Sequence, residues 1–498
     1  MKRLARDVLL LAFATGISRV FGLFRDMTIA DKFGASAAYD AFLIAFFLPH
    51  FLRQLLAEGA LSTAFIPAYT DALVNDREAN RLASNVLSLL VIIFPPVVAA
   101  GVFLAPYYLP FLASGFPSEK LRLSIHLAQI LFPFIALVGF AAVFMGILNA
   151  HHRFLAAATA PVMFNLGMIA GALLISPRFA IPITGLAIGA LIGGAGQLLF
   201  QVPAVVKSGF RFRFTLFPLH PGVLRMGWVM APAVIGLAVT QLNLLVDNKL
   251  ASYLGTGAIS SLQYAMRLFQ LPLGMFAVSI ATALLPRFSR AVARADESLL
   301  RDQLRTGIEA SALVLLPAMV GLYALGRPII ALLFQHGNFT ATDTARTAQV
   351  LYCYLIGILP YGLVYTFTRA FYALGRTSYP LIASAGAVAA NIVFDLLLVG
   401  PLGARGLALA TSVSGITNAT ILFFALVNQI GPGRKTAASL GKIVLGCLLL
   451  YGVVLGVELG LAGWNLPGFV FIAIVTGAVV YVVYAKISGL DEIVTRLT

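Results

Sequence analysis

The chain has 498 residues, of which 60% are apolar and 11% are charged, and its formal net charge is +15. A typical soluble domain is about 45–50% apolar and about 25% charged, so this composition excludes both a soluble globular protein and a disordered chain. Two cysteines exclude a disulfide-stabilised secreted scaffold. Short basic clusters between apolar segments argue against nucleic-acid binding. The remaining class is an all-α polytopic membrane protein, because runs such as Leu87–Leu104 lack the alternation of a transmembrane β-barrel.

Each helix needs about 20 apolar residues to cross the bilayer core, and the sequence predicts fourteen such spans. Their centres lie near Gly16, Leu48, Ile93, Ala136, Ala170, Ile192, Val239, Phe276, Val314, Ile358, Ala390, Gly415, Leu449 and Val475. No small-residue cleavage site follows the basic segment Met1–Asp7. We therefore expect the first helix to stay as a span and not to be removed as a signal peptide.

Lysine and arginine are distributed unequally between the predicted loops. With a cytoplasmic N-terminus, 21 of the 34 basic residues lie on the cytoplasmic side and seven on the outer side. The basic loops follow spans six, eight and twelve. The positive-inside rule therefore predicts that both termini are cytoplasmic. The positive-inside rule is enough to account for the basic loops. The alternative is that these loops have a regulatory or partner-binding role.

An internal repeat with an offset near 220 residues relates the two halves of the chain. The matching positions are Gly34 with Gly255, Ala128–Leu131 with Ala348–Leu351, and Gly185 with Gly406. Each repeat holds six spans, so both start on the same side of the membrane and run parallel. Parallel repeats around a central cavity are a transporter architecture. We expect an N-lobe over residues 1–220, a C-lobe over 221–432 and an added helix pair over 433–498.

Several predicted spans contain ionisable residues, each of which costs at least about 2.5–3.5 kcal/mol to insert. Polar residues in the first two spans are Ser18, Arg19, Arg25, Asp26, Asp40, Arg53 and Glu58, and Arg267 lies in the eighth. Pro49 and Pro272 predict interrupted helices at corresponding places in the two halves, which points to a substrate site. Four arginines on one cavity favour a diphosphate, because guanidinium groups bind phosphate oxygens in pairs. Alternatively, the arginines reach the membrane interface or pair with these carboxylates.

A second polar cluster lies in the C-terminal half. It consists of Asp247 in the seventh span, Asn391 and Asp395 in the eleventh, and Thr411 in the twelfth. Carboxylate, amide and hydroxyl oxygens suit a hard cation such as Na⁺. The alternative is a hydrogen-bond network between helices, with Asp395 protonated or Asp247 paired to Lys249. The sequence has neither a nucleotide-binding loop nor an acidic magnesium cluster, so it predicts a transporter and not an enzyme.

Four segments resemble the MurJ (MviN) lipid II flippases of the multidrug/oligosaccharidyl-lipid/polysaccharide exporter superfamily. They are Ser18–Asp26, Tyr39–Pro67, Tyr264–Gly274 and Leu333–Thr340, and the resemblance runs from about Ala5 to the C-terminal spans. It implies two six-helix lobes and two C-terminal helices that form a hydrophobic groove for a lipid tail. It also implies that the chain moves lipid II, an undecaprenyl-diphosphate glycopeptide, across the bacterial cytoplasmic membrane. We further expect a monomer whose partners are membrane lipids and cell-wall synthesis proteins.

The resemblance also assigns site residues. The family's cavity arginines match Arg19, Arg25, Arg53 and Arg267, its functional acid matches Asp40, and its glutamate matches Glu58. The sodium-site positions of some members match Asp247, Asn391, Asp395 and Thr411. Some members have an acid directly before the eighth-span arginine, where this chain has Met266. The ion-pair partner that this acid would give Arg267 is therefore missing here.

A cationic cavity in the unloaded protein responds to membrane potential by about 2.3 kcal/mol per charge per 100 mV. We therefore expect alternating access that is reset by membrane potential, with Na⁺ as a coupling ion. Three other functions are the alternatives. A drug antiporter would need an acid-rich cavity, which the arginines argue against. An exporter of another polyprenyl-diphosphate glycan stays open. An intramembrane transferase lacks the expected pair of catalytic carboxylates.

Overall fold

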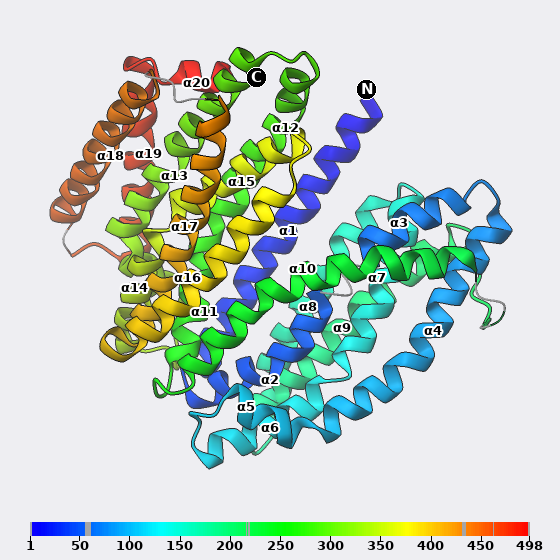
Figure 1. The fold of residues 1–498 in the computed structure, drawn as a ribbon. Coiled ribbons are helices and arrows are strands. Elements are labelled where there is room, and N and C mark those ends of the chain that lie inside the picture. Colours follow the sequence, from blue (N-terminus) through cyan, green and yellow to red (C-terminus); the bar gives the residue numbers. More distant parts are fainter. Residues whose placement is uncertain are drawn as a thin grey trace. The chain divides into compact units, whose positions relative to one another are not determined.

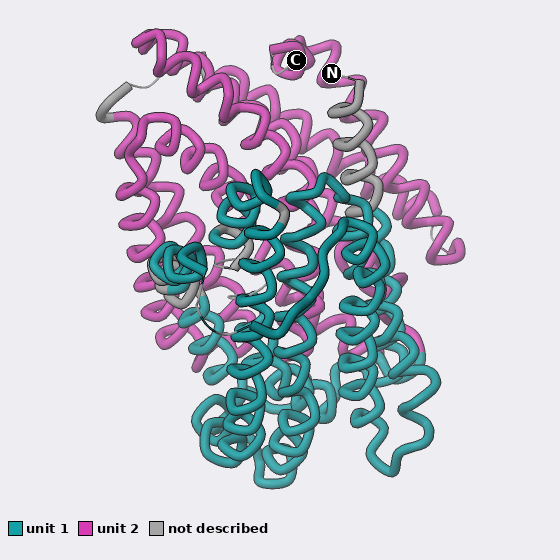
Figure 2. The backbone as a smooth tube through the Cα atoms, turned by 90° about the vertical axis from the view of Figure 1, so that its right-hand side faces the viewer, with its two compact units in different colours: residues 1–257, 337–339 teal, residues 258–336, 340–498 magenta. Residues whose placement is uncertain are grey.

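The computed structural model describes residues 2–54, 61–215, 217, 220–430, 435–461 and 463–496. These residues form helices joined by turns and, over residues 210–215, by an extended segment, and they contain no β-strand (Figure 1). The chain divides into two compact units, shown in different colours in Figure 2. Unit 1 comprises residues 1–257 and 337–339, and unit 2 comprises residues 258–336 and 340–498. Each unit is described separately below.

Unit 1 is a helical bundle in which α8 packs against both α1 and α9, and α2 packs against α6. Glycines allow α8 and α9 to approach closely, since a Cβ on Gly167 would lie 2.3 Å from the Cα of Gly193. Its α-helices are α1 (Lys2–Phe33), α2 (Ala37–Arg53), α3 (Leu61–Ala72), α4 (Asp76–Phe103), α5 (Ala105–Leu112), α6 (Ser118–Leu131), α7 (Phe134–Ala150), α8 (Phe154–Ala170), α9 (Ile183–Val206) and α10 (Pro221–Ala251). A π-helical turn η2 (Gly171–Ile175) and a 3₁₀ turn η3 (Ser176–Arg178) extend α8.

Unit 2 is built around the long helix α13, which packs against α12, α14, α15 and α18. Its elements are α11 (Ala258–Pro272), the π-helical turn η4 (Leu273–Ala277), α12 (Val278–Ala293), α13 (Glu297–Phe334), α14 (Ala341–Leu355), α15 (Ile358–Ala373), α16 (Ser378–Leu402), α17 (Ala404–Ile430), α18 (Lys435–Gly460), α19 (Leu466–Ile487) and α20 (Asp491–Thr495). Asp296 caps α13 by accepting a hydrogen bond from the Leu299 N–H, and this bond lowers the pKa of its carboxyl.

Among the described residues, ten helical stretches are long and apolar enough to cross a membrane, and the bent pair α14–α15 makes an eleventh. They contain the predicted centres of spans three to six and eight to fourteen, with Ile358 at the bend of 42° between α14 and α15. The other three predicted spans lie on α1, on α2–α3 and on α10. The prediction of an all-α multi-pass membrane protein is confirmed.

Two pairs of glycines occupy equivalent places in the two halves of the chain. Gly34 and Gly255 both have positive φ, +58° and +82°, in the turns that precede α2 and α11. Gly185 and Gly406 both lie near the start of a helix, α9 and α17, where a Cβ would collide with the preceding helical segment. Equivalent turns with the same requirement for glycine are what a duplicated six-helix repeat predicts.

The predicted lobes and the two compact units have different limits. The proposed C-lobe starts at residue 221, but α10 contacts α3, α4 and α5 and therefore belongs to unit 1, which extends to Gly257. The C-terminal pair α18–α19 packs on α13 within unit 2. Pro272 ends α11 and is followed directly by the π-helical turn η4 and then by α12, so the helix changes geometry after this proline while the span Ala258–Ala293 continues. At Pro49, where the sequence predicts a break or a kink, α2 is not broken and continues through this buried residue to Arg53.

Candidate functional site

A network of charged and amide side chains joins α1 to α8 in unit 1. Arg25 donates from Nε and Nη2 to Asp26 Oδ1, at 2.9 and 2.7 Å, and from Nη1 to Asn165 Oδ1 at 3.0 Å. Asn165 in turn donates from Nδ2 to the backbone carbonyl of Ser18 at 3.2 Å. The Arg25 and Asp26 side chains are largely buried. The sequence left open whether the arginines pair with nearby carboxylates, and the structure shows such a pair between Arg25 and Asp26. Asn165 fixes the direction of the Arg25 guanidinium.

The second network of unit 1 surrounds Asp40, which is completely buried. Its Oδ2 accepts from Lys120 Nζ at 2.8 Å and from the Gly257 N–H at 2.7 Å. Lys120 is also buried, and its ammonium lies 4.0 Å from the ring centroid of Phe116. Asp40 therefore connects α2, the first turn of α6 and the segment that precedes α11. In this conformation its carboxylate forms a structural ion pair and does not face open solvent.

The other predicted residues of the first two spans have different surroundings. Arg19 is exposed on α1, six residues before Arg25, while Ser18 is half-buried. Arg53 is half-buried in the last turn of α2. Glu58 lies outside the residues that the structure describes.

Arg267 belongs to unit 2. It is exposed on α11, two turns before the π-helical turn η4. Its neighbours on α11, Tyr264 and Leu268, are buried, so this helix directs an apolar face inward and a cationic side chain outward. The structure thus separates the four predicted arginines into three of unit 1 and one of unit 2.

Three of the four predicted sodium ligands lie on the adjacent helices α16 and α17 of unit 2. Asn391 and Asp395 are fully buried one turn apart, and Asn391 Nδ2 donates to Asp395 Oδ2. Thr411, on α17, is buried and donates from Oγ1 to the Leu407 carbonyl at 3.0 Å. Asp247, half-buried on α10, belongs to unit 1. Carboxylate, amide and hydroxyl oxygens in a buried position fit a hard cation.

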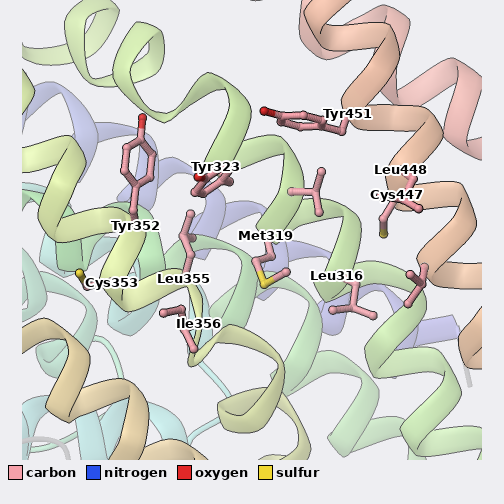
Figure 3. A pocket seen from close by; sticks show the side chains of 12 residues that line it. Leu316, Met319, Tyr323, Tyr352, Cys353, Leu355, Ile356, Cys447, Leu448 and Tyr451 are labelled. Atoms are coloured by element: carbon pink, nitrogen blue, oxygen red, sulfur yellow. The ribbon is translucent and has the colours of Figure 1, made fainter.

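An apolar cavity of about 590 Å³ opens between α13, α14 and α18 of unit 2 (Figure 3). Met319 lies at its centre in this view, and three tyrosines, Tyr323, Tyr352 and Tyr451, lie toward one end. The rest of the lining is Leu316, Val320, Cys353, Leu355, Ile356, Val444, Cys447 and Leu448. A cavity with this lining suits a hydrocarbon chain, and the predicted C-terminal pair contributes α18 to it.

Sequence reasoning missed Asn165 and Lys120. Asn165 is a lone amide within an apolar span, and an intramembrane polar residue is itself a signal for an interhelical contact. Lys120 lies between two predicted spans, where a basic residue is expected in a loop and gives no sign of burial. Its partner Asp40 is 80 residues away, so nothing local in the sequence reveals the pair.

These features define a multi-pass helical membrane protein, with paired charges in unit 1 and buried polar side chains on α16 and α17 of unit 2. The family model described as "Lipid II flippase MurJ" matches residues 29–476. The chain therefore belongs to the MurJ family.

Several relatives cover nearly the whole chain. The probable lipid II flippase MurJ of Thermotoga maritima is 35% identical over 97% of both chains. That of Vibrio cholerae is 35% identical over 91% of this chain and 89% of its own. A solved structure described as lipid II flippase MurJ in an inward closed conformation has a TM-score of 0.83, with 31% identity over 97% of this chain and 100% of its own.

A multidrug MATE transporter in an inward-facing conformation has a TM-score of 0.68 at 18% identity, over 88% of this chain and 99% of its own. At that identity the likeness concerns the fold alone. It agrees with the predicted all-α membrane fold.

Proposed function

We propose that the chain is a lipid II flippase of the bacterial cytoplasmic membrane, with both termini in the cytoplasm. The observation that carries the proposal is its family membership, with relatives of that name covering nearly the whole chain. The cargo joins an apolar tail to a diphosphate and a polar sugar-peptide head. Moving that head through the bilayer core unaided would be prohibitive, so the protein has to supply polar partners along the way. The work is transport, with no bond in the cargo made or broken.

The diphosphate binds to Arg19, Arg25 and Arg53 of unit 1 and Arg267 of unit 2 during transport. Arginine suits this role because its planar guanidinium binds two phosphate oxygens at once. Arg25 is held by Asp26 and Asn165 in the present structure. An arriving phosphate competes with the Asp26 carboxylate for the same donors, and Asn165 keeps the guanidinium in place during the exchange. Ser18, Asp40 and Glu58 act as supporting residues.

The hydrocarbon tail stays in an apolar environment while the head moves. The cavity between α13, α14 and α18 is lined almost entirely by apolar atoms, so a tail segment entering it stays out of water. In this proposal the tail lies beside the C-terminal helix α18.

Alternating access carries the head from the inner to the outer leaflet, and membrane potential resets the unloaded protein. Sodium is the proposed coupling ion, held by Asn391, Asp395 and Thr411 together with Asp247. Burial of Asn391, Asp395 and Thr411 supports the assignment, because buried carboxylates are usually paired or bind a cation.

The direct test is rescue of a bacterium whose own lipid II flippase is depleted. Wild-type chain is expected to restore growth, whereas Arg19→Ala and Arg267→Ala are expected to fail while still inserted in the membrane. Arg301→Ala, which removes an exposed arginine of α13 outside the proposed site, is the matched control and is expected to rescue.

Failure of well-expressed wild type would refute lipid II as the cargo and favour another polyprenyl-diphosphate glycan. Rescue by both arginine variants would refute the cationic binding site while leaving the cargo intact.

A further inference from the structure

The segment between α9 and α10 is an extended chain fastened along one face of α4. Three alternate backbone N–H groups donate to three polar side chains spaced four residues apart on that helix. The bonds are Arg211 N–H to Asn80 Oδ1 (3.1 Å), Arg213 N–H to Ser84 Oγ (3.2 Å) and Thr215 N–H to Ser88 Oγ (3.0 Å). Figure 1 shows α4 as one of the long helices of the fold.

Three successive hydrogen bonds form because the spacing of the side chains along α4 matches the spacing of the N–H groups along the extended segment. Four residues of an α-helix rise about 6.0 Å, and two residues of an extended chain advance about 6.6 Å. Asn85 completes the contact, donating from Nδ2 to the Thr215 carbonyl at 2.6 Å and accepting at Oδ1 from the His220 N–H at 2.8 Å. Ser84, Asn85 and Ser88 are all buried. The segment is therefore held rigidly against α4.

The side chains of this segment remain exposed. Arg211 and Arg213 alternate with Phe212 and Phe214, whose side chains are 49% and 58% exposed. In an extended chain, N–H groups of successive residues point to opposite sides, so those of Phe212 and Phe214 point away from α4. Among the described residues, none accepts a hydrogen bond from either. Lys207 adds a further exposed cation at the start of the segment.

We propose that residues 207–215 form a binding site for the phosphate groups of anionic phospholipids. Two guanidinium groups and outward N–H groups are suitable donors for phosphate oxygens. Exposed phenylalanines beside them are suited to the boundary between headgroups and acyl chains. Basic clusters beside a membrane helix attract acidic lipids. The backbone of the segment is fixed by its hydrogen bonds to α4, so the two arginines are held in place although they do not lie on a helix. The inference rests on the cytoplasmic placement of this loop proposed above and is independent of the cargo.

The test places a fluorescent reporter in the segment of the full chain. The chain has two tryptophans, Trp228 and Trp464, both exposed, so Trp228→Phe, Trp464→Phe and Phe212→Trp together leave one indole, at position 212. The protein is reconstituted in vesicles containing brominated phosphatidylglycerol or brominated phosphatidylcholine, and quenching of this indole gives the relative affinity for each lipid. Each basic residue near an anionic surface contributes about fivefold. We expect a preference for phosphatidylglycerol of at least that size.

Two further variants separate a local site from general charge attraction. Arg211→Gln with Arg213→Gln is expected to abolish the preference at position 212. Arg294→Gln with Arg301→Gln removes the same charge from exposed positions of unit 2 and is expected to leave it unchanged. Equal quenching by both lipids in the parent protein would overturn the proposal, as would a preference that survives the loss of Arg211 and Arg213. Each of these results can occur whether or not the chain rescues a flippase-depleted cell.

Discussion

The buried pair of Asp40 and Lys120 gives the sharpest prediction about stability. Their charged atoms are 2.8 Å apart, which corresponds to about 6 kcal/mol of attraction at an effective dielectric constant of 20. Desolvation offsets much of this, but removing one partner leaves the other charge buried, at a cost of about 3–5 kcal/mol. Lys120→Met is expected to cost more than Asp40→Asn, because an asparagine oxygen still accepts from the lysine and from Gly257.

A double-mutant cycle tests this reasoning by thermal unfolding in detergent. The double variant is expected to lose about as much stability as one single variant, since it leaves no unpaired charge. Arg122→Met is the matched control, because Arg122 is exposed on the same helix two residues further on, and its loss should change stability by less than about 0.5 kcal/mol. Additive losses in the double variant would show that the ion pair makes no net contribution.

Three further changes have defined outcomes. Asn165→Leu removes the amide that holds Arg25 and is expected to cost about 1–3 kcal/mol in unfolding free energy; an unchanged unfolding temperature would contradict the network. Gly34→Ala is expected to cost at least about 1 kcal/mol more than Gly255→Ala, because both have positive φ but only position 34 meets a close neighbour. Asp395→Ala is expected to abolish a rise in unfolding temperature in Na⁺ relative to K⁺, and a sodium response equal to wild type would remove Asp395 from the proposed site.

The sequence predicts the helical architecture well because hydrophobicity is a property of each segment by itself. The span near Ile93 needs no information from elsewhere in the chain, and the helix over Asp76–Phe103 contains it. The limits of a unit depend instead on contacts between distant segments. Helix α10 has the position of a first helix in the second repeat, yet its contacts with α3 and α4 place it in unit 1.

In the candidate site, too, the sequence predicts which residues are unusual but not which residues they contact. An arginine within an apolar segment indicates a candidate functional residue, so the sequence predicts Arg25 as one. Its actual partners depend on where α8 lies, and Asn165 is 140 residues away. The polar stripe Asn80, Ser84 and Ser88 is visible as a spacing of four in the sequence. Its partner is the backbone of an extended loop, which has no residue signature.

A cargo can shift a transporter between conformations only by binding one of them better than the other. In unit 1, the guanidinium of Arg25 is already neutralised by Asp26 and oriented by Asn165. A diphosphate that replaced the carboxylate would release Asp26 while keeping the arginine neutralised. Its effect on the conformational equilibrium therefore depends on how much better Arg25 binds the diphosphate than Asp26, and not on total charge. Asp26→Asn should therefore weaken the competition and tighten diphosphate binding in a direct binding assay. Weaker binding by this variant would mean that Asp26 serves the cargo by holding Arg25 in place.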